Sequence, residues 1–254
     1  MVIYEKRGPI GLLTIDRPEA RNAVNGDVAE GMEAAIDEME ADEEVWIGIL
    51  AGNGPVFCAG ADLKAISSGQ AAALNTKRGG FGGIVTRERV KPIIAAVDGP
   101  ALAGGTEIVL ACDLVVASTQ ARFGIPEVKR SLVAAAGGLF RLPRKIPFNI
   151  AMEAALTGDP ISAERAYHFG LVNRLVEPGT AFDAAIELAE AISVNAPLAV
   201  RESRRLVLES ITVTDDGEGV RQSGAALMGL ASTEDFAEGP MAFIEKRDPV
   251  WKGR

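Results

Sequence analysis

A pair of glycines followed closely by a carboxylate is the stretch of this sequence with the clearest chemical potential. Gly104 and Gly105 open a segment with helical spacing, and Glu107 lies in its first turn. The first N–H groups of a helix are unpaired and carry the positive end of its dipole. Glycine also lets a ligand approach the backbone closely. We therefore expect the N–H of Gly104 or Gly105 to hold a developing negative oxygen, with Glu107 beside it as an acid or base.

The elements around this turn are predicted to be strand, turn, helix and strand. Ile93–Val97 is an apolar run, residues 98–100 read Asp-Gly-Pro, and Leu114–Ala117 is a second apolar run. A similar arrangement occurs earlier, where the apolar run Val45–Leu50 precedes a second glycine-rich turn, at Gly60. A short helix is expected to start after this turn, at about residue 61.

Composition limits the kind of protein and the kind of chemistry. The chain has 254 residues, 48% hydrophobic and 24% charged, with a net charge of -9, which argues against non-specific nucleic-acid binding. There is neither an apolar run long enough for a transmembrane helix nor a signal-peptide pattern, so we expect a cytoplasmic protein with no membrane partner. Cys58 and Cys112 are expected to be buried, reduced thiols. The single histidine, His168, disfavours a catalytic triad or a multi-histidine metal site, so chemistry must come from carboxylates, backbone donors, lysine or arginine.

The remaining elements follow from periodicity and turn signals. Asn25 is a plausible N-cap for a helix that runs to about Ala41. Residues 64–89 are irregular and are expected to form a mobile lid or a pocket wall, ending in a helical turn at Val85–Val90. Residues 195–197 read Asn-Ala-Pro and predict a boundary, so the chain is divided into a core (1–195) and a C-terminal helical region (196–254). Further strands are expected at Val2–Glu5, Gly11–Ile15 and Leu171–Val176. Further helices are expected at Ala151–Leu156, Phe182–Ile192, Leu198–Ser210, Glu218–Leu230 and Thr233–Phe243.

Seven segments, in order and covering nearly the whole chain, resemble the crotonase superfamily, the enoyl-CoA hydratase/isomerase family. They are RPEARNAV (17–24), CAGADLK (58–64), GPALAGGTEIVLACDLVVA (99–117), FGIPEV (123–128), AAGGLFRLPR (135–144), AxxxGLVNRLV (166–176) and EGPMAFIEKRDP (238–249). The resemblance implies an α/β fold, a spiral of ββα turns rather than a Rossmann sheet. It also implies a C-terminal helical region that makes homotrimers, often paired into homohexamers, and binding of acyl-CoA thioesters with no cofactor and no metal.

The resemblance also implies roles for individual residues. The backbone N–H groups of Ala61 and Gly104 would form an oxyanion hole for the thioester oxygen, in agreement with the physical argument above. Hydratases of the family carry two glutamates, which correspond here to Glu107 and Glu127. We assign Glu107 as the base that activates water and Glu127 as the proton donor to C2. The alternative for Glu107 is a carboxylate that only stabilises the N-terminus of its helix, and the alternative for Glu127 is a surface charge on a loop.

The expected coenzyme A contacts are less specific. The adenine is expected against the backbone of 59–64, and Lys246 and Phe243 match a C-terminal run that can reach coenzyme A of a neighbouring subunit. For Lys64, Arg21 and Lys246 a solvated surface charge is an equal alternative. The predicted substrate and coenzyme A contacts are Arg21, Ala23, Ala59, Asp62, Leu63, Lys64, Gly105, Phe243 and Lys246.

The predicted activity is hydration of trans-2-enoyl-CoA to 3-hydroxyacyl-CoA, or the reverse, by an enzyme of the lyase class. The alternatives are enoyl-CoA isomerisation, dehydration of a hydroxyacyl-CoA such as carnitinyl-CoA, and binding of acyl-CoA without catalysis. One departure from the family bears on specificity. Ala134–Ala136 stand where typical hydratases have Pro-Gly-Ala, so the loop near Glu127 is expected to differ in shape.

Overall fold

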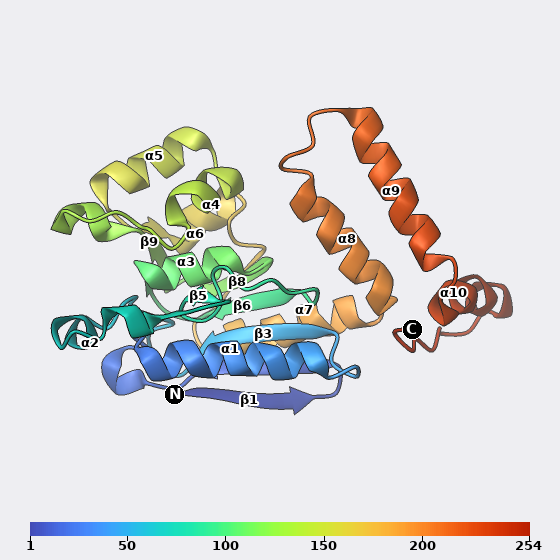
Figure 1. Cartoon of the computed structure of the whole chain (residues 1–254), viewed down its shortest axis with the longest axis horizontal. Helices are drawn as coiled ribbons and strands as arrows, with labels where there is room; N and C mark the ends of the chain where they lie inside the picture. The colour runs from blue at the N-terminus through green and yellow to red at the C-terminus, as the bar shows by residue number, and fades with distance from the viewer.

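The computed structural model describes residues 1–254 and is built on a six-stranded sheet (Figure 1). The strand order is β1-β2-β3-β6-β8-β11; β1 and β2 are antiparallel, and every other neighbouring pair is parallel. The strands are β1 (Val2–Arg7), β2 (Ile10–Ile15), β3 (Ile47–Gly52), β6 (Ile93–Val97), β8 (Leu114–Ser118) and β11 (Arg174–Val176).

Short strands form a second sheet, of three strands, and the chain forms a spiral because it alternates between the two sheets. β7 (Ala101–Leu102) and β9 (Arg122–Gly124) are parallel, and β10 (Ile161–Ser162) pairs with β9 in the antiparallel sense. Thus β6 joins the large sheet, β7 joins the small one, and α3 (Gly104–Ala111) follows; β8 and β9 repeat the pattern before α4 (Gly138–Lys145). An isolated bridge between Cys58 and Ala101 adds the preceding turn of the spiral. The α/β spiral of ββα turns is therefore confirmed.

The two faces of the large sheet are covered by different helices. Alternate strand residues such as Ile49 and Ile94 pack with α7 (Ala181–Ser193), while Leu50 and Ile93 face the larger core that includes α1 (Gly26–Ala41). Asn25 caps α1 as predicted, because its side chain accepts a hydrogen bond from the Val28 N–H. The other helices of the core are α2 (Leu63–Ser67), α5 (Phe148–Thr157) and α6 (Ala163–His168), with 3-10 turns at Pro18–Ala20, Ala71–Leu74 and Pro126–Arg130.

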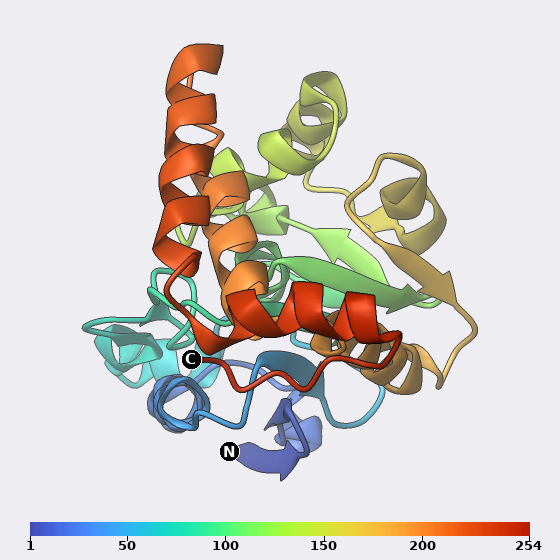
Figure 2. The same ribbon diagram turned by 90° about the vertical axis from the view of Figure 1, so that its right-hand side faces the viewer.

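Only helices follow residue 195, as predicted. α8 (Pro197–Glu209) and α9 (Asp216–Leu230) lie side by side and stand off from the sheet, and α10 (Glu234–Glu245) lies near the end of the chain (Figures 1 and 2). Arg204 of α8 joins the core through a 2.9 Å ion pair with Asp113. The division at residues 195 and 196 into two domains stays a prediction. None of the helices is long and apolar enough to cross a membrane.

One predicted element is wrong. Val85–Val90 contains no helix; residues 82–86 are turn, and the following residues run without regular structure to β6. The N–H groups of Val90 and Lys91 donate to the Glu40 carboxylate of α1, and the Arg89 side chain pairs with Asp113, so the end of this segment bonds to the core instead of forming helical hydrogen bonds. The irregular segment before residue 82 contains only α2, a 3-10 turn and the small hairpin of β4 (Asn75–Thr76) and β5 (Gly80–Phe81).

Candidate active site

A cavity of about 730 Å³ brings together residues from three parts of the chain. Its lining includes Ala61 before α2, Gly104 and Glu107 on α3, and Glu127 in the 3-10 turn after β9. These four are the predicted oxyanion-hole and catalytic residues. The irregular segment also contributes part of the wall, including Phe81 of β5. The predicted chemical groups therefore share one cavity.

The two predicted oxyanion donors are free. The N–H groups of Ala61 and Gly104 donate to no other group of the chain. Gly60 holds the two turns together: its φ is 93°, and a β-carbon there would lie 3.0 Å from the Gly104 nitrogen and 2.8 Å from the β-carbon of Ala103. The close approach of these turns requires a residue without a side chain at position 60. Two unpaired N–H groups at a helix start can stabilise an anionic oxygen.

Strain accumulates at the residue that caps α3. Ala103 has φ 51° and ψ -128°, a region that residues with a β-carbon rarely adopt. Its backbone N–H donates to the Gly124 oxygen at 2.8 Å, so β9 holds it in this conformation. Strain of this kind is typical of functional sites.

Replacing Ala103 by glycine is expected to stabilise the protein. Relief of the strained backbone is worth roughly 1–3 kcal/mol, of which about half a kcal/mol to 1 kcal/mol is offset by the greater freedom of glycine in the unfolded chain. The free energy of unfolding, measured by urea denaturation, should therefore rise by about 1 kcal/mol. A decrease would show that the conformation of Ala103 is not strained.

Glu107 is a buried carboxylate with fixed partners. It is 3% exposed, and its Oε1 accepts a 2.9 Å hydrogen bond from the Gly138 N–H at the start of α4. Burial raises its pKa above the ordinary value, and the charge of Glu127 raises it further, whereas the N–H groups of Gly138 and Ala136 oppose this shift. The pKa is raised overall, and the hydrogen bond from Gly138 limits the rise because it stabilises the ionised form, which is the form that accepts a proton.

Glu127 has a different environment. Its Oε2 atom is buried and has no hydrogen-bond partner, although the residue as a whole is only half-buried. Burial raises the pKa of Glu127 above its ordinary value. A carboxyl group whose buried oxygen lacks a donor favours the protonated form, which is the form that gives up a proton. Both pKa values are raised, and the two groups differ in their donors: the Gly138 N–H stabilises the charge of Glu107, whereas Glu127 Oε2 has no donor, which suits Glu107 better to the base and Glu127 better to the acid.

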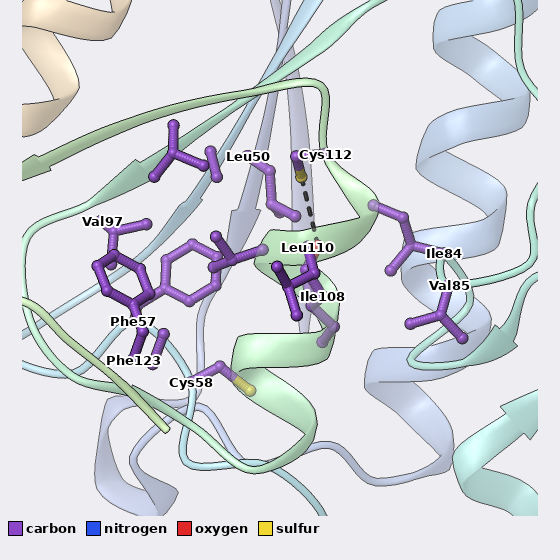
Figure 3. Close-up of a cluster of buried hydrophobic side chains, with 14 of the residues drawn as sticks. Leu50, Phe57, Cys58, Ile84, Val85, Val97, Ile108, Leu110, Cys112 and Phe123 are labelled. Atoms are coloured by element: carbon purple, nitrogen blue, oxygen red, sulfur yellow. Dashed lines mark hydrogen bonds between the residues drawn. The ribbon is translucent and has the colours of Figure 1, made fainter. Parts of the chain in front are cut away.

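The helix that carries Glu107 rests on a tightly packed cluster (Figure 3). Ile108 and Leu110 of α3 are buried there with Phe57 and Phe123, and the Cys112 thiol donates to the Ile108 oxygen. Both thiols are free and buried, as predicted, and burial raises the pKa of each to about 12. At neutral pH they are inert, and the cluster serves to fix α3 in position.

The predicted coenzyme A contacts fall into two groups. Arg21, Ala59 and Leu63 line the cavity. The others do not: the Asp62 carboxylate caps α2 and forms a 3.0 Å ion pair with Arg17, and Gly105 is buried against the Cys58 oxygen. Also outside the lining are Ala23, whose oxygen binds Arg17, the exposed Lys64, Phe243 on α10, which is 86% exposed, and Lys246 at the end of α10.

Two further residues shape the cavity but were not predicted. The Phe81 ring lies so close to Gly104 that any side chain at position 104 would collide with it. Arg141 of α4 donates to the oxygens of Val85, at 2.5 Å, and Ala136, at 3.3 Å, and so ties two walls together. Phe81 lies in the irregular segment and belongs to no motif. Arg141 lies within the segment 135–144 that resembles the family, but no role was assigned to it.

The comparisons with known proteins agree over the full length. The model of the enoyl-CoA hydratase/isomerase family matches residues 5–254. The chain is 39% identical to a carnitinyl-CoA dehydratase of Salmonella paratyphi A, over 98% of this chain and 97% of that protein.

Solved structures give the same result. The crystal structure of an enoyl-CoA hydratase from Mycobacterium tuberculosis H37Rv has a TM-score of 0.95 at 49% identity, covering 100% of this chain and 99% of that one. The structure of a carnitinyl-CoA hydratase from Mycobacterium avium has a TM-score of 0.78 at 47% identity, covering 100% and 98%. With the free donors and the two carboxyls in one cavity, these similarities establish that the chain belongs to the enoyl-CoA hydratase/isomerase family.

Proposed function

We propose that this protein hydrates trans-2-enoyl-CoA to 3-hydroxyacyl-CoA and catalyses the reverse dehydration. The observation that carries the proposal is the presence of two carboxyls, the buried Glu107 and the half-buried Glu127, in the same cavity as the free N–H groups of Ala61 and Gly104. No cofactor and no metal are proposed to take part. An acyl-CoA thioester is the proposed substrate, and the enzyme belongs to the lyase class.

The steps follow from the environment of each group. Ionised Glu107 takes a proton from water, and the water oxygen forms a bond to C3 while the C2–C3 double bond opens. Charge moves into the thioester carbonyl, where the N–H groups of Ala61 and Gly104 stabilise the enolate oxygen. Protonated Glu127 then gives its proton to C2. The 3-hydroxyacyl thioester leaves with one more water than the substrate, and the two carboxyls have exchanged their protonation states.

The test is loss of enone absorbance when the purified protein meets short-, medium- and long-chain trans-2-enoyl-CoA. The proposal expects turnover of at least one chain length, and its absence on all of them would contradict it. The variant Glu107→Ala separates hydration from isomerisation. If Glu107→Ala kept full activity on a 3-enoyl-CoA, the reaction would be isomerisation, since a single carboxylate suffices for it.

The pH profile should reflect both carboxyls. The pKa values of Glu107 and Glu127 are raised, so kcat/KM is expected to fall at low pH as the base is protonated and at high pH as the acid ionises. Both limbs should lie above the ordinary glutamate value of about 4.3. The apparent values belong to the pair, because the two groups are coupled. Initial rates at limiting substrate between pH 4 and 10 check this, and a profile without a basic limb would contradict the assignment of Glu127.

Dehydration of carnitinyl-CoA is the second candidate. The names of the relatives from Salmonella and Mycobacterium avium support it. The cavity contains no carboxylate besides Glu107 and Glu127, but the rings of Phe81 and Phe140 line it, and aromatic faces bind quaternary ammonium groups. Comparing kcat/KM for crotonobetainyl-CoA and crotonyl-CoA decides between the two substrates.

Self-association is proposed for the C-terminal helices, as a homotrimer or a pair of trimers. Apolar side chains on α9 and α10 are largely exposed in the single chain: Val220 (73%), Met228 (72%), Phe243 (86%) and Ile244 (72%). In such an assembly Phe243 and Lys246 would approach the cavity of a neighbouring subunit. Light scattering should give a mass about three or six times that of the chain, and Phe243→Asp should lower it. A monomeric wild type would contradict the proposal. We further propose that the protein works in the cytoplasm.

A further inference from the structure

Arg141 lines the catalytic cavity, but the proposed reaction gives it no role. It lies in the first turn of α4, a few residues after Gly138, whose N–H donates to Glu107 Oε1 at 2.9 Å. The side chain is only partly exposed, and no hydrogen bond or ion pair joins it to Glu107. Its connection to Glu107 runs through the backbone between them.

The Arg141 guanidinium bridges two backbone segments. One of its terminal nitrogens donates to the Val85 oxygen at 2.5 Å, and the other donates to the Ala136 oxygen at 3.3 Å. A guanidinium can hold two acceptors in a fixed geometry, because its donors form a rigid, planar fork. The bridge therefore fixes the turn of residues 136–138, which leads into α4, against the wall formed by residues 82–86.

The Arg141 side chain also packs on this turn. Gly137 has a φ of 112°, and a β-carbon built there would lie 2.2 Å from Arg141 Nη1. The guanidinium carbon lies over the Phe140 ring, 4.9 Å from its centre. Only glycine at position 137 leaves room for the guanidinium, so the turn and the arginine form one packed unit.

The turn that Arg141 holds is the one that binds Glu107. Like the Gly138 N–H, the Ala136 N–H lowers the pKa of Glu107, against the rise caused by burial and by the charge of Glu127. Ala136 thus acts on the Glu107 carboxylate through its N–H and accepts from Arg141 through its oxygen. A displacement of this turn would take both N–H donors away from Glu107.

The charge of Arg141 acts in the same direction as these donors. The groups that act on the guanidinium are Glu107 on α3, the cations Arg89 and Arg144, and the thiol of Cys112, which is neutral because its pKa is about 12. Glu107 is the carboxylate in this set. A guanidinium stays protonated at neutral pH, so it favours the ionised form of Glu107.

We propose that Arg141 is a positioning residue for Glu107: it locks the turn of residues 136–138 so that two N–H groups stay on the Glu107 carboxylate, and its positive charge favours the ionised form. Its own hydrogen bonds go to backbone oxygens, so it acts through the turn rather than on the reacting atoms. This inference rests on the proposed function, in which ionised Glu107 is the base.

The titration of Glu107 tests the proposal without requiring turnover. Infrared difference spectra recorded against pH follow the C=O band of protonated carboxyls, and the part that is missing in Glu107→Gln belongs to Glu107. Recording them in proteins that carry Glu127→Gln leaves one carboxyl of the coupled pair. Arg141→Met removes both the bridge and the charge, so the pKa of Glu107 should rise.

Kinetics of Arg141→Met, with Glu127 present, give a second readout. The acid limb of kcat/KM should move to higher pH, because a base with a higher pKa is protonated earlier as pH falls. We expect kcat to fall about 10- to 100-fold, the usual effect of a misplaced catalytic group, while KM changes little.

Arg144→Met is the matched control. Arg144 is exposed, lies on the same helix and has its guanidinium carbon 5.3 Å from the centre of the same Phe140 ring, but it does not line the catalytic cavity. It should leave the Glu107 pKa and kcat unchanged. Arg141→Lys retains the charge but reaches only one of the two oxygens, so its Glu107 pKa and kcat should lie between those of wild type and Arg141→Met.

An unchanged Glu107 pKa in Arg141→Met, with or without a loss of kcat, would overturn the proposal, and so would an equal rise in Arg144→Met. If Arg141→Met does not fold, Arg141→Lys decides the question by the same criterion. A wild type that hydrates no enoyl-CoA, together with the expected rise of the Glu107 pKa, would refute the proposed function and leave the positioning of Glu107 standing. Hydration by the wild type with an unchanged pKa in the variants would refute this inference alone.

Discussion

Glu127→Gln is expected to lower kcat for hydration of trans-2-enoyl-CoA by about 10²- to 10⁴-fold, the usual contribution of a positioned acid or base. Glutamine has nearly the same shape but cannot give a proton to C2. The affinity for a saturated acyl-CoA should therefore change little. The measurement is stopped-flow loss of enone absorbance at saturating substrate, with acyl-CoA affinity from calorimetry.

The same variant should be more stable at neutral pH. A raised pKa means that folding favours protonated Glu127, so its stabilising contribution is present below the ordinary pKa and is lost as pH rises through the folded value. Glutamine stays neutral, so thermal unfolding of Glu127→Gln should occur at a higher temperature than wild type at pH 7, and the difference should vanish near pH 4. Glu30→Gln, on the exposed face of α1, is the control for both measurements. Full activity of Glu127→Gln would remove Glu127 from the mechanism.

Gly60→Ala is expected to affect both activity and stability strongly. The new β-carbon would lie 2.8 Å from the Ala103 β-carbon and 3.0 Å from the Gly104 nitrogen, so the two turns must separate. If this displaces one oxyanion donor from the thioester oxygen, kcat should fall about 10²- to 10³-fold. The strained φ and the collision together should lower the free energy of unfolding by about 3 kcal/mol. Steady-state kinetics and urea denaturation measure the two effects.

Gly170→Ala is the matched control. Gly170 has φ 86°, close to that of Gly60, but no atom lies within 4 Å of a β-carbon built there. It should lose only about 1–2 kcal/mol of stability, the penalty for a left-handed backbone with a side chain, and keep its kcat. Equal losses of kcat in both variants would mean that backbone strain, rather than separation of the donors, causes the effect of Gly60→Ala.

The sequence could predict elements whose signals are local. The N-cap at Asn25, the helices after residue 195 and the burial of both cysteines depend on nearby residues or on simple apolar patterns, and the structure bears them out. Ala61, Gly104, Glu107 and Glu127 were predicted from motifs of the family that the sequence resembles, and the structure brings all four together in one cavity. Their catalytic roles stay predictions.

Features that depend on distant contacts could not be predicted. The path of Val85–Val90 depends on residues far along the chain, because the N–H groups of Val90 and Lys91 donate to Glu40 and Arg89 pairs with Asp113. Arg141 acquires its place only because α4 packs beside residues 82–86. The departure at Ala134–Ala136 leaves the N–H of Ala136 facing Glu107, and its effect on acyl specificity stays a prediction.

The free donors of this cavity belong to the main chain, and this affects how the protein tolerates mutation. Replacing the side chain of Ala61 does not delete its N–H, and only proline would do so. Glu107 and Glu127, in contrast, are each removed by a single substitution. In the proposed mechanism, substitution of either glutamate can therefore abolish or redirect proton transfer while anion stabilisation is inherited, as long as the glycines that bring the two turns together are kept. A descendant of this chain could lose hydration and still retain the means to start a different reaction on a thioester.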